Sequence, residues 1–379
     1  MELDLSLATL VTVAVISGRL IVPLFIPAYP LPAILGAMVL DAVDQTIFSI
    51  TIGGELAGYQ TYDKALDIYY LAIAYVSTMA NWVAGPAFVV GRFLWYYRLV
   101  GVALFESTGA RWILFVFPNT FEYFFDVIEA YKLGRNPFSI ALKWIVGIAA
   151  FIWIVIKLPQ EWWIHIAQLD FTDFAKETIF GVAADSSWTD AIANRPFVTL
   201  AIVVGVVALL LLARWATRFL PPRDWPLTAS ADRQAEHLGW PPRPTVVGPS
   251  AAFDRTFVEK VILLSLMVFV FSRMLPGIEG RPLQVLLAVG LIIGASTVVS
   301  QLLAHRSVAW GSLATEFGVM VVVNAAIGIG IGLLLPGDGP MPPLVEYLFL
   351  VAVVSLITVM FDRSTQIGRA RAASLTAAG

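Results

Sequence analysis

The stretch GVMVVVNAAIGIGIGLLL, residues 318–335, decides the fold of this 379-residue chain. Its only strongly polar side chain is Asn324, and its length approaches the roughly 20 apolar residues that cross a bilayer as one α-helix. Similar runs recur along nearly the whole chain, in which hydrophobic residues make up 59% and charged residues 13%. Ordinary soluble domains have about 45–50% and about 25%. We therefore predict an all-α, polytopic bundle of transmembrane helices.

The apolar runs divide into about eleven expected spans, separated by short polar or proline-containing turns. They cover residues 5–26, 33–53, 66–83, 86–105, 111–130, 138–157, 197–217, 257–275, 283–303, 313–335 and 344–361.

Basic residues gather in connections that fall on one side of the membrane if the count is eleven. The clusters are Lys132 and Arg135; Arg214, Arg218, Arg223, Arg233, Arg243 and Arg255; Arg306; and Arg363, Arg369 and Arg371. Because loops rich in Lys and Arg stay in the cytoplasm, we expect a multi-pass cell-membrane protein with its N-terminus outside and its C-terminus inside.

Two longer connections organise the chain. In residues 158–196, an amphipathic helix near 160–180 is expected to lie in the membrane interface, either as an aromatic depth anchor or as a lipid-facing gate. Residues 218–256 are rich in proline and mixed charge, which predicts an extended, mobile cytoplasmic linker. The expected divisions are an N-terminal bundle (1–157), the interfacial segment (158–196), a linking span (197–217), the linker (218–256), a C-terminal scaffold bundle (257–361) and a tail (362–379).

Composition excludes several functions. A formal charge of −3 gives no basic face for nucleic acid. With no cysteine, the chain has no ligands for an iron–sulfur cluster. The three histidines all fall outside the middle of the predicted spans, so paired axial ligands for a haem are missing.

The C-terminal bundle is expected to be scaffold. Gly290 and Gly294, and likewise Gly328 and Gly332, are four residues apart, a spacing that lets helices approach closely in lipid. These glycines would pack within the bundle or against a second copy of the chain. Asn324 is expected to form an interhelical hydrogen bond.

The N-terminal bundle has a different chemistry, because its spans contain charge. A charged side chain in a membrane costs roughly 2.5–3.5 kcal/mol, so such residues should face protein or water. Helical spacing places them in stripes on one face of each helix. The candidate ion- or substrate-binding residues are Asp41, Asp44, Asp63, Asp67, Arg92, Arg98, Asn119, Glu122 and Asp126.

Clustered carboxylates repel one another unless positive charge intervenes, and three sources remain open. Lys64, Arg92 or Arg98 could form a structural ion-pair network. Protons could be shared among the carboxylates. A divalent cation such as Mg²⁺ could bind them, with Asp41, Asp44, Asp63 and Asp67 as metal ligands. In addition, Pro118 should kink its span and free a backbone oxygen beside Asn119.

The divalent alternative has a partial counterpart in a known family. Asp41 and Asp44, Gly58, and Asp63 and Asp67 resemble the metal-binding signature of the CDP-alcohol phosphatidyltransferases, over 27 of 379 residues. The sequence departs from that signature at Gln45, where the family has glycine, at Phe48 and Ser49, and by one inserted residue before Asp63. The resemblance implies phosphodiester exchange at a bound metal.

We therefore expect a cation- or proton-coupled transporter or permease with an outward-opening acidic cavity, acting on a small or lipidic solute. Asp44 and Asp67 would coordinate or titrate, Asp41 and Asp63 would support them, and Arg92 or Arg98 would be the countercharge. One alternative is a Mg²⁺-dependent phospho- or glycosyltransferase that acts on a lipid-linked substrate. The other is a non-catalytic subunit of a membrane complex.

Overall fold

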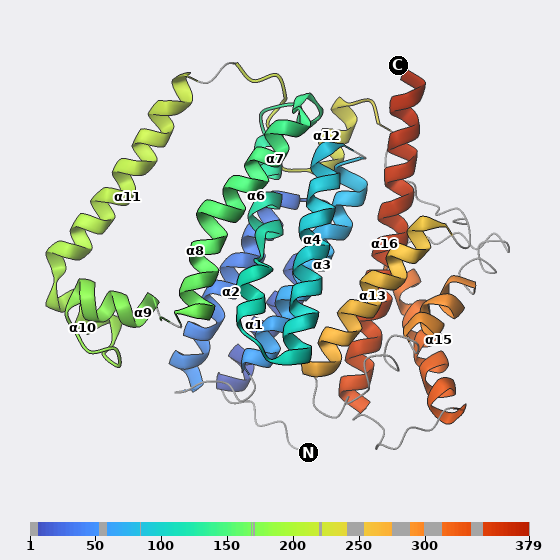
Figure 1. Ribbon diagram of the computed structural model, residues 1–379, viewed down its shortest axis with the longest axis horizontal. Helices are drawn as coiled ribbons and strands as arrows, with labels where there is room; N and C mark the ends of the chain where they lie inside the picture. Colours follow the sequence, from blue (N-terminus) through green and yellow to red (C-terminus); the bar gives the residue numbers. More distant parts are fainter. Residues whose placement is uncertain are drawn as a thin grey trace.

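The computed structural model describes residues 7–52, 59–83, 85–167, 169, 171–219, 222–240, 254–274, 289–298, 313–334 and 344–378. Every regular element in these ranges is helical (Figure 1). The helices are α1 (Leu7–Ile21), η1 (Val22–Phe25), α2 (Pro30–Ile52), α3 (Tyr59–Asn81), α4 (Pro86–Thr108), α5 (Trp112–Val116), α6 (Thr120–Lys132), η2 (Pro137–Ser139), α7 (Leu142–Phe151), η3 (Ile152–Lys157), α8 (Leu158–Glu161), η4 (Trp162–Ile166), α9 (Phe171–Phe174), η5 (Ala175–Phe180), α10 (Trp188–Asn194), α11 (Pro196–Ala216), η6 (Thr217–Phe219), α12 (Ala231–His237), α13 (Arg255–Met274), an apolar helix Val289–Val298, α15 (Leu313–Leu334) and α16 (Leu344–Ala378).

Five helices of the described chain are long and apolar enough to cross a membrane. They are Pro86–Thr108, Leu142–Ile166, Pro196–Phe219, Leu313–Gly330 and Leu344–Ala377. Each predicted span overlaps a described helix, so the all-α membrane class stands. The number of eleven spans is not confirmed, because the other helices are shorter or carry more charge.

Helix α3 lies at the centre of the largest hydrophobic core. Residues Ala72 to Val76 are fully buried, and side chains of α2, α4, α6, α13 and α16 pack around them. A helix that is apolar or aromatic on all sides is buried on all sides. Because this core contains residues from both ends of the chain, the two expected bundles form one packed unit.

The predicted tail, 362–379, is instead the continuation of α16, which lies along α3. Gly368 packs directly on the backbone carbonyl of Met79, a place where a Cβ would overlap that carbonyl. Arg371 is 1% exposed and donates to the carbonyl of Ala80 at 2.9 Å and to Oδ1 of Asn81 at 3.3 Å. These contacts require a structured helix rather than a free tail.

Part of the predicted mobile linker is also packed. Within residues 222–240, Trp225 and Trp240 are buried, and the N–H of Ala231 donates to the carbonyl of Ala28 at 2.9 Å. The guanidinium of Arg371 lies 5.5 Å from the ring centre of Trp240, a cation–π contact. Composition predicted disorder here, but two tryptophans provide enough apolar surface to dock the segment on the bundle.

The expected boundary at residue 157 is wrong, because one helix runs from Leu142 to Ile166. Pro159 lies inside it without ending it. π-helical turns precede and follow α8, and Pro159 lies in the first turn of α8, where proline is tolerated. The expected interfacial helix is thereby shortened to α9 and η5, and their place in the interface stays a prediction.

Helix α11 stands apart from the rest of the molecule at the left of Figure 1. None of its residues is buried, and its mean hydropathy of 2.8 is the highest among the five candidate spans. An apolar helix with no protein neighbours on any side is stable in lipid but not in water.

In the C-terminal part, the prediction for Asn324 is confirmed. Its side chain accepts from the hydroxyl of Ser296 and donates to the hydroxyl of Ser355 at 2.9 Å. Gly328 packs against the hydroxyl end of Tyr347. By contrast, no described atom lies near the open side of Gly290 or Gly294, so their packing stays a prediction.

Candidate functional site

Arg19 of α1 is the centre of the acidic cluster. Its Nη1 contacts Oδ2 of Asp44, and its Nη2 contacts Oδ1 of Asp41 and, at 3.2 Å, Oδ1 of Asp67. Asp41 and Asp44 share one face of α2 because they are three residues apart, and Asp67 comes from α3. The structure therefore brings together three of the four predicted aspartates around a guanidinium, whereas the side chain of Asp63 lies outside the described residues.

We expected Asp44 and Asp67 to be the residues that meet a ligand, but the exposure of the side chains differs from this expectation. The side chain of Asp44 is 0% exposed and lies beneath Arg19, whereas those of Asp41 and Asp67 are 31% and 35% exposed and face a cavity. Asp44 is therefore shielded from the cavity, whereas Asp41 and Asp67 line it.

A second polar group surrounds Glu122 at the start of α6. Its carboxylate accepts from the hydroxyl of Tyr70 at 2.5 Å and from Nδ2 of Asn119 at 2.9 Å. Nζ of Lys157 lies 3.5 Å from Glu122 Oε2 and 3.8 Å from the ring centre of Tyr123. Glu122 is mostly buried at the edge of the cavity described below, so these contacts stabilise a charge that has little access to water.

The chain breaks its helical course beside this group, as Pro118 predicts. Helix α5 ends at Val116, α6 begins at Thr120, and ψ is 66° at both Phe117 and Asn119. The carbonyls released by the break are hydrogen-bonded by α4: Tyr97 donates to Val116 at 2.9 Å and Arg98 to Phe117 at 3.0 Å. Arg98 therefore binds the backbone at the break.

Glu161 of α8 closes the other side of the break. Its carboxylate accepts from the backbone N–H of Asn119 at 3.2 Å and from Nε2 of His165 at 3.0 Å. Oδ1 of Asn119 is buried and has no hydrogen-bond partner among the described residues. A polar atom of this kind marks a place for water or a ligand.

These groups enclose a polar cavity of about 340 Å³, which we call the acidic cavity. It is lined by Asp41, Asp67, Ile68, Leu71, Arg98, Val102, Phe105, Leu114, Asn119, Glu122, Lys157, Gln160, Glu161, Ile164 and His165. With Arg19 and Asp44 included, the described residues around it contain five carboxylates and three side chains that are always basic. Carboxylates therefore outnumber basic side chains around the cavity.

The remaining predicted residues lie outside the cavity lining. Arg92 pairs with Glu259 of α13 at 2.8 Å, and Tyr75 and Tyr96 donate to the same carboxylate. Asp126 lies one turn beyond Glu122 on α6 and has a buried oxygen without a hydrogen-bond partner among the described residues. Arg92 is therefore not the countercharge of the acidic cluster; Arg19 has that place.

Sequence reasoning missed Tyr70, Lys157, Glu161 and His165 and did not assign Arg19 as the partner. Lys157, Glu161 and His165 are spaced four apart, which is a one-face stripe on a continuous helix. The premature boundary at residue 157 separated them. The sequence did contain a signal for Arg19. It is an isolated basic residue within the first predicted span, and such a residue needs an acidic partner.

The described side chains include no group of three His, Asp or Glu arranged to hold a metal. At the aspartate cluster, Arg19 supplies positive charge where the divalent alternative places a cation. The cavity itself offers carboxylate, amide and imidazole groups that can bind a proton, a small cation or water.

Comparisons of the chain with protein-family models, with curated proteins and with solved structures find no match. The class of the protein thus rests on its own geometry. It is an all-helical protein with several helices able to cross a membrane, and it has a buried, acidic cavity beside a broken helix.

Proposed function

We propose that this protein is a multi-pass membrane transporter in which the acidic cavity takes up a proton or a small cation. Binding of that cation is coupled to the movement of a small or lipidic solute. The observation that supports this most is the excess of carboxylates over basic side chains in a cavity enclosed by apolar helices. Ionisable groups inside a membrane protein usually mark ion and proton paths.

The broken helix strengthens the proposal. Transport sites often form where a helix is interrupted, because the free backbone groups and nearby side chains can bind an ion and can rearrange. Here the break at Phe117 to Asn119 lies between Arg98 and Glu161, and the buried Oδ1 of Asn119 still needs a partner. Cation entry would change the contacts of Glu122 and Asp67, which have the cavity on one side.

The contacts also support an orientation. The Lys132–Arg135 loop, the segment 222–240 and the end of α16 meet at one end of the bundle, where Arg135 reaches the carbonyl of Pro222 at 3.5 Å and Arg371 reaches Asp232 at 3.4 Å. We propose that this basic end is cytoplasmic. The acidic cavity lies toward the opposite end of α3 and would open outside, in the eleven-span arrangement with an external N-terminus.

The partners that we propose are membrane lipid and a second copy of the chain. The exposed apolar helices would be surrounded by membrane lipid, and the open Gly290 and Gly294 face could pack against a second copy. No observation on the described residues favours the transferase over transport, and the same experiment separates the two.

The first arm of that experiment measures cation binding. The full-length protein is purified in detergent, and its melting temperature is followed against pH and against Na⁺, K⁺, Mg²⁺, Mn²⁺ and Ca²⁺. We expect a response to pH or to one monovalent cation, because ligands that bind the folded state stabilise it. Asp67→Asn and Glu122→Gln should remove the response, and Glu236→Gln, at an exposed position of α12, should keep it.

The second arm measures movement of charge in liposomes that contain a pH-sensitive dye and carry an imposed membrane potential. Flux should fall by about tenfold or more in Glu122→Gln, because a positioned proton-transfer group is lost. A divalent-specific response that both cavity variants abolish would favour the transferase. No response to any ion, with no flux above empty liposomes, would leave only a structural role and contradict the proposal.

A further inference from the structure

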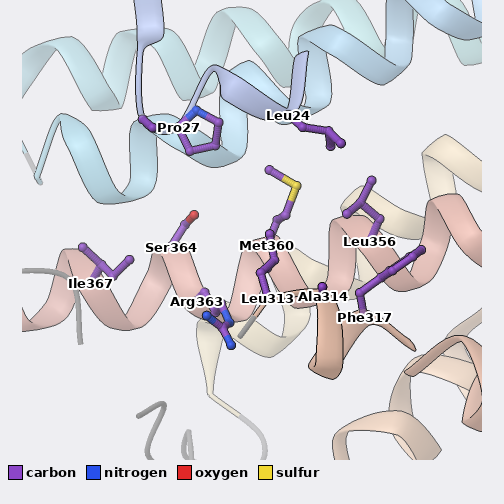
Figure 2. Close-up of a pocket in the computed structure, with 11 residues that line it drawn as sticks. Leu24, Pro27, Leu313, Ala314, Phe317, Leu356, Met360, Arg363, Ser364 and Ile367 are labelled. Carbon is purple, nitrogen blue, oxygen red and sulfur yellow. The ribbon is translucent and has the colours of Figure 1, made fainter. Parts of the chain in front are cut away.

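A second cavity of about 550 Å³ lies between the N-terminal segment and the C-terminal helices and shares no lining residue with the acidic cavity. One wall is η1 with Leu24 and the turn that follows it with Pro27, and the other is α16. Figure 2 shows Leu356, Met360 and Ser364 extending from one face of α16 toward that turn. Helix α15 closes the cavity with Leu313, Ala314 and Phe317.

The cavity is apolar toward the membrane centre and polar toward the basic end. Along α16 it runs from Leu356 to Ile367, and its polar groups, Arg363 and Ser364, are in the half nearer Arg371. The span Leu313–Gly330 begins beside the same half. The ends of membrane spans lie at the depth of the lipid headgroups, so this gradient matches that of a lipid molecule.

The guanidinium of Arg363 is paired with Glu316, but one of its nitrogens has no hydrogen-bond partner among the described residues. Its Nε donates to Oε2 of Glu316 at 2.6 Å, but its Nη2 is buried and has no hydrogen-bond partner among the described residues. A guanidinium has five N–H donors in a planar fork that fits phosphate oxygens. The hydroxyl of Ser364, the next residue on α16, could donate to the same group.

We propose that this cavity binds a bilayer phospholipid, with an acyl chain along Leu356 and Met360 and its phosphate on Arg363 and Ser364. The occupant follows from the location: apolar walls inside the membrane, and a cation at headgroup depth, select a phosphate with a hydrocarbon chain. The site is independent of the transport proposal, since none of its residues lines the acidic cavity.

The test compares two lipids with identical acyl chains, phosphatidylglycerol and diacylglycerol, which differ in the phosphate. The full-length protein is delipidated in detergent, and binding is measured by native mass spectrometry and by the shift of melting temperature. We expect saturable binding of phosphatidylglycerol and at least about tenfold weaker binding of diacylglycerol, the loss expected when a charge-assisted hydrogen bond is removed.

Two variants locate the site. Arg363→Gln should weaken phosphatidylglycerol binding by about tenfold or more. Ala314→Phe should fill the cavity and block both lipids. Its matched control is Val322→Phe on the same helix, where the side chain is 69% exposed and outside the cavity. If Arg363→Gln does not fold after losing its contact with Glu316, Ala314→Phe and the milder Ser364→Ala still decide the question.

Three results would overturn the proposal. Equal binding of the two lipids, unchanged in Arg363→Gln, would show that phosphate is not recognised. Full binding in a folded Ala314→Phe protein would place the lipid elsewhere. A lower melting temperature of Ala314→Phe in the absence of lipid, compared with Val322→Phe, would mean that other residues of the chain fill the cavity.

Discussion

At the scale of single residues, the main feature of this protein is one arginine that contacts three aspartates. Arg19 is 2% exposed and contacts aspartates of two other helices, one of which, Asp44, is completely buried. Removing one member of such a buried ion-pair group is strongly destabilising, because the remaining charges stay buried without compensation. The arrangement also places Asp41 and Asp67, both in contact with Arg19, in the lining of the acidic cavity.

We predict that Arg19→Gln destabilises the protein strongly, by about 3–5 kcal/mol, because it leaves buried carboxylates without their countercharge. Thermal unfolding in detergent measures the loss. Arg19→Lys should recover only part of it, since an ammonium lacks the planar fork that reaches two carboxylates at once.

The control for this change is Arg214→Gln on α11, where the side chain is exposed. Adding Asp44→Asn to Arg19→Gln should restore part of the stability, which a double-mutant cycle detects. A loss in Arg19→Gln no larger than that in Arg214→Gln would contradict the central position of Arg19.

The sequence predicted the acidic residues of this site better than their partners. Helical spacing alone placed Asp41 with Asp44, and a short connection made α2 and α3 neighbours, so convergence with Asp67 followed. The choice of Arg19 over Arg92 or Arg98 depends on the register and rotation of separate helices. A single sequence does not contain that information.

At the scale of elements, the acidic cavity depends on interruptions of helices. The break between α5 and α6 turns backbone toward α4 and α8, and the π-helical turns around α8 keep Lys157, Glu161 and His165 in one continuous helix. Pro118 made the first interruption predictable. The span expected to end at residue 157 instead continues through Pro159 to Ile166.

The close approach of α4 to the break gives a second prediction. A Cβ at Gly101 would overlap the Cβ of Phe117, which has little freedom to move because its backbone is part of the break. Gly101→Ala should therefore lower stability by about 1–3 kcal/mol and weaken the cation response of the acidic cavity.

Gly147→Ala in α7 is the matched control, because it has open space around its Cβ position. This change should be neutral or slightly stabilising, since alanine favours helix. Melting temperatures of both variants measure the difference, and equal values would contradict the tight packing at the break.

At the scale of the whole molecule, the chain is more interlocked than its composition suggests. Residues 222–240, part of the linker predicted to be mobile, and the end of α16 meet at one end through Trp240 and Arg371, and α16 packs along α3. Composition predicted the membrane class correctly because apolar runs are local. It did not predict these long-range contacts, since they depend on a few large side chains meeting across the fold.

The central claim is that the acidic cavity is open to water from the side opposite this basic end. The natural chain has no cysteine, so single cysteines can be introduced without background reaction. Val102 lines the cavity, and Val100, two residues earlier on α4, is 37% exposed on the outside of the helix and does not line it.

The decisive measurement is the reaction of Val102→Cys and Val100→Cys in intact cells with a cationic, membrane-impermeant thiosulfonate, which reacts with thiolates in water. Glu236→Cys on α12 is the control for the cytoplasmic side. We predict rapid modification of Val102→Cys from outside, none of Val100→Cys, and modification of Glu236→Cys only after permeabilisation. Modification of Val102→Cys only after permeabilisation, or not at all, would contradict an outward-opening, water-filled cavity.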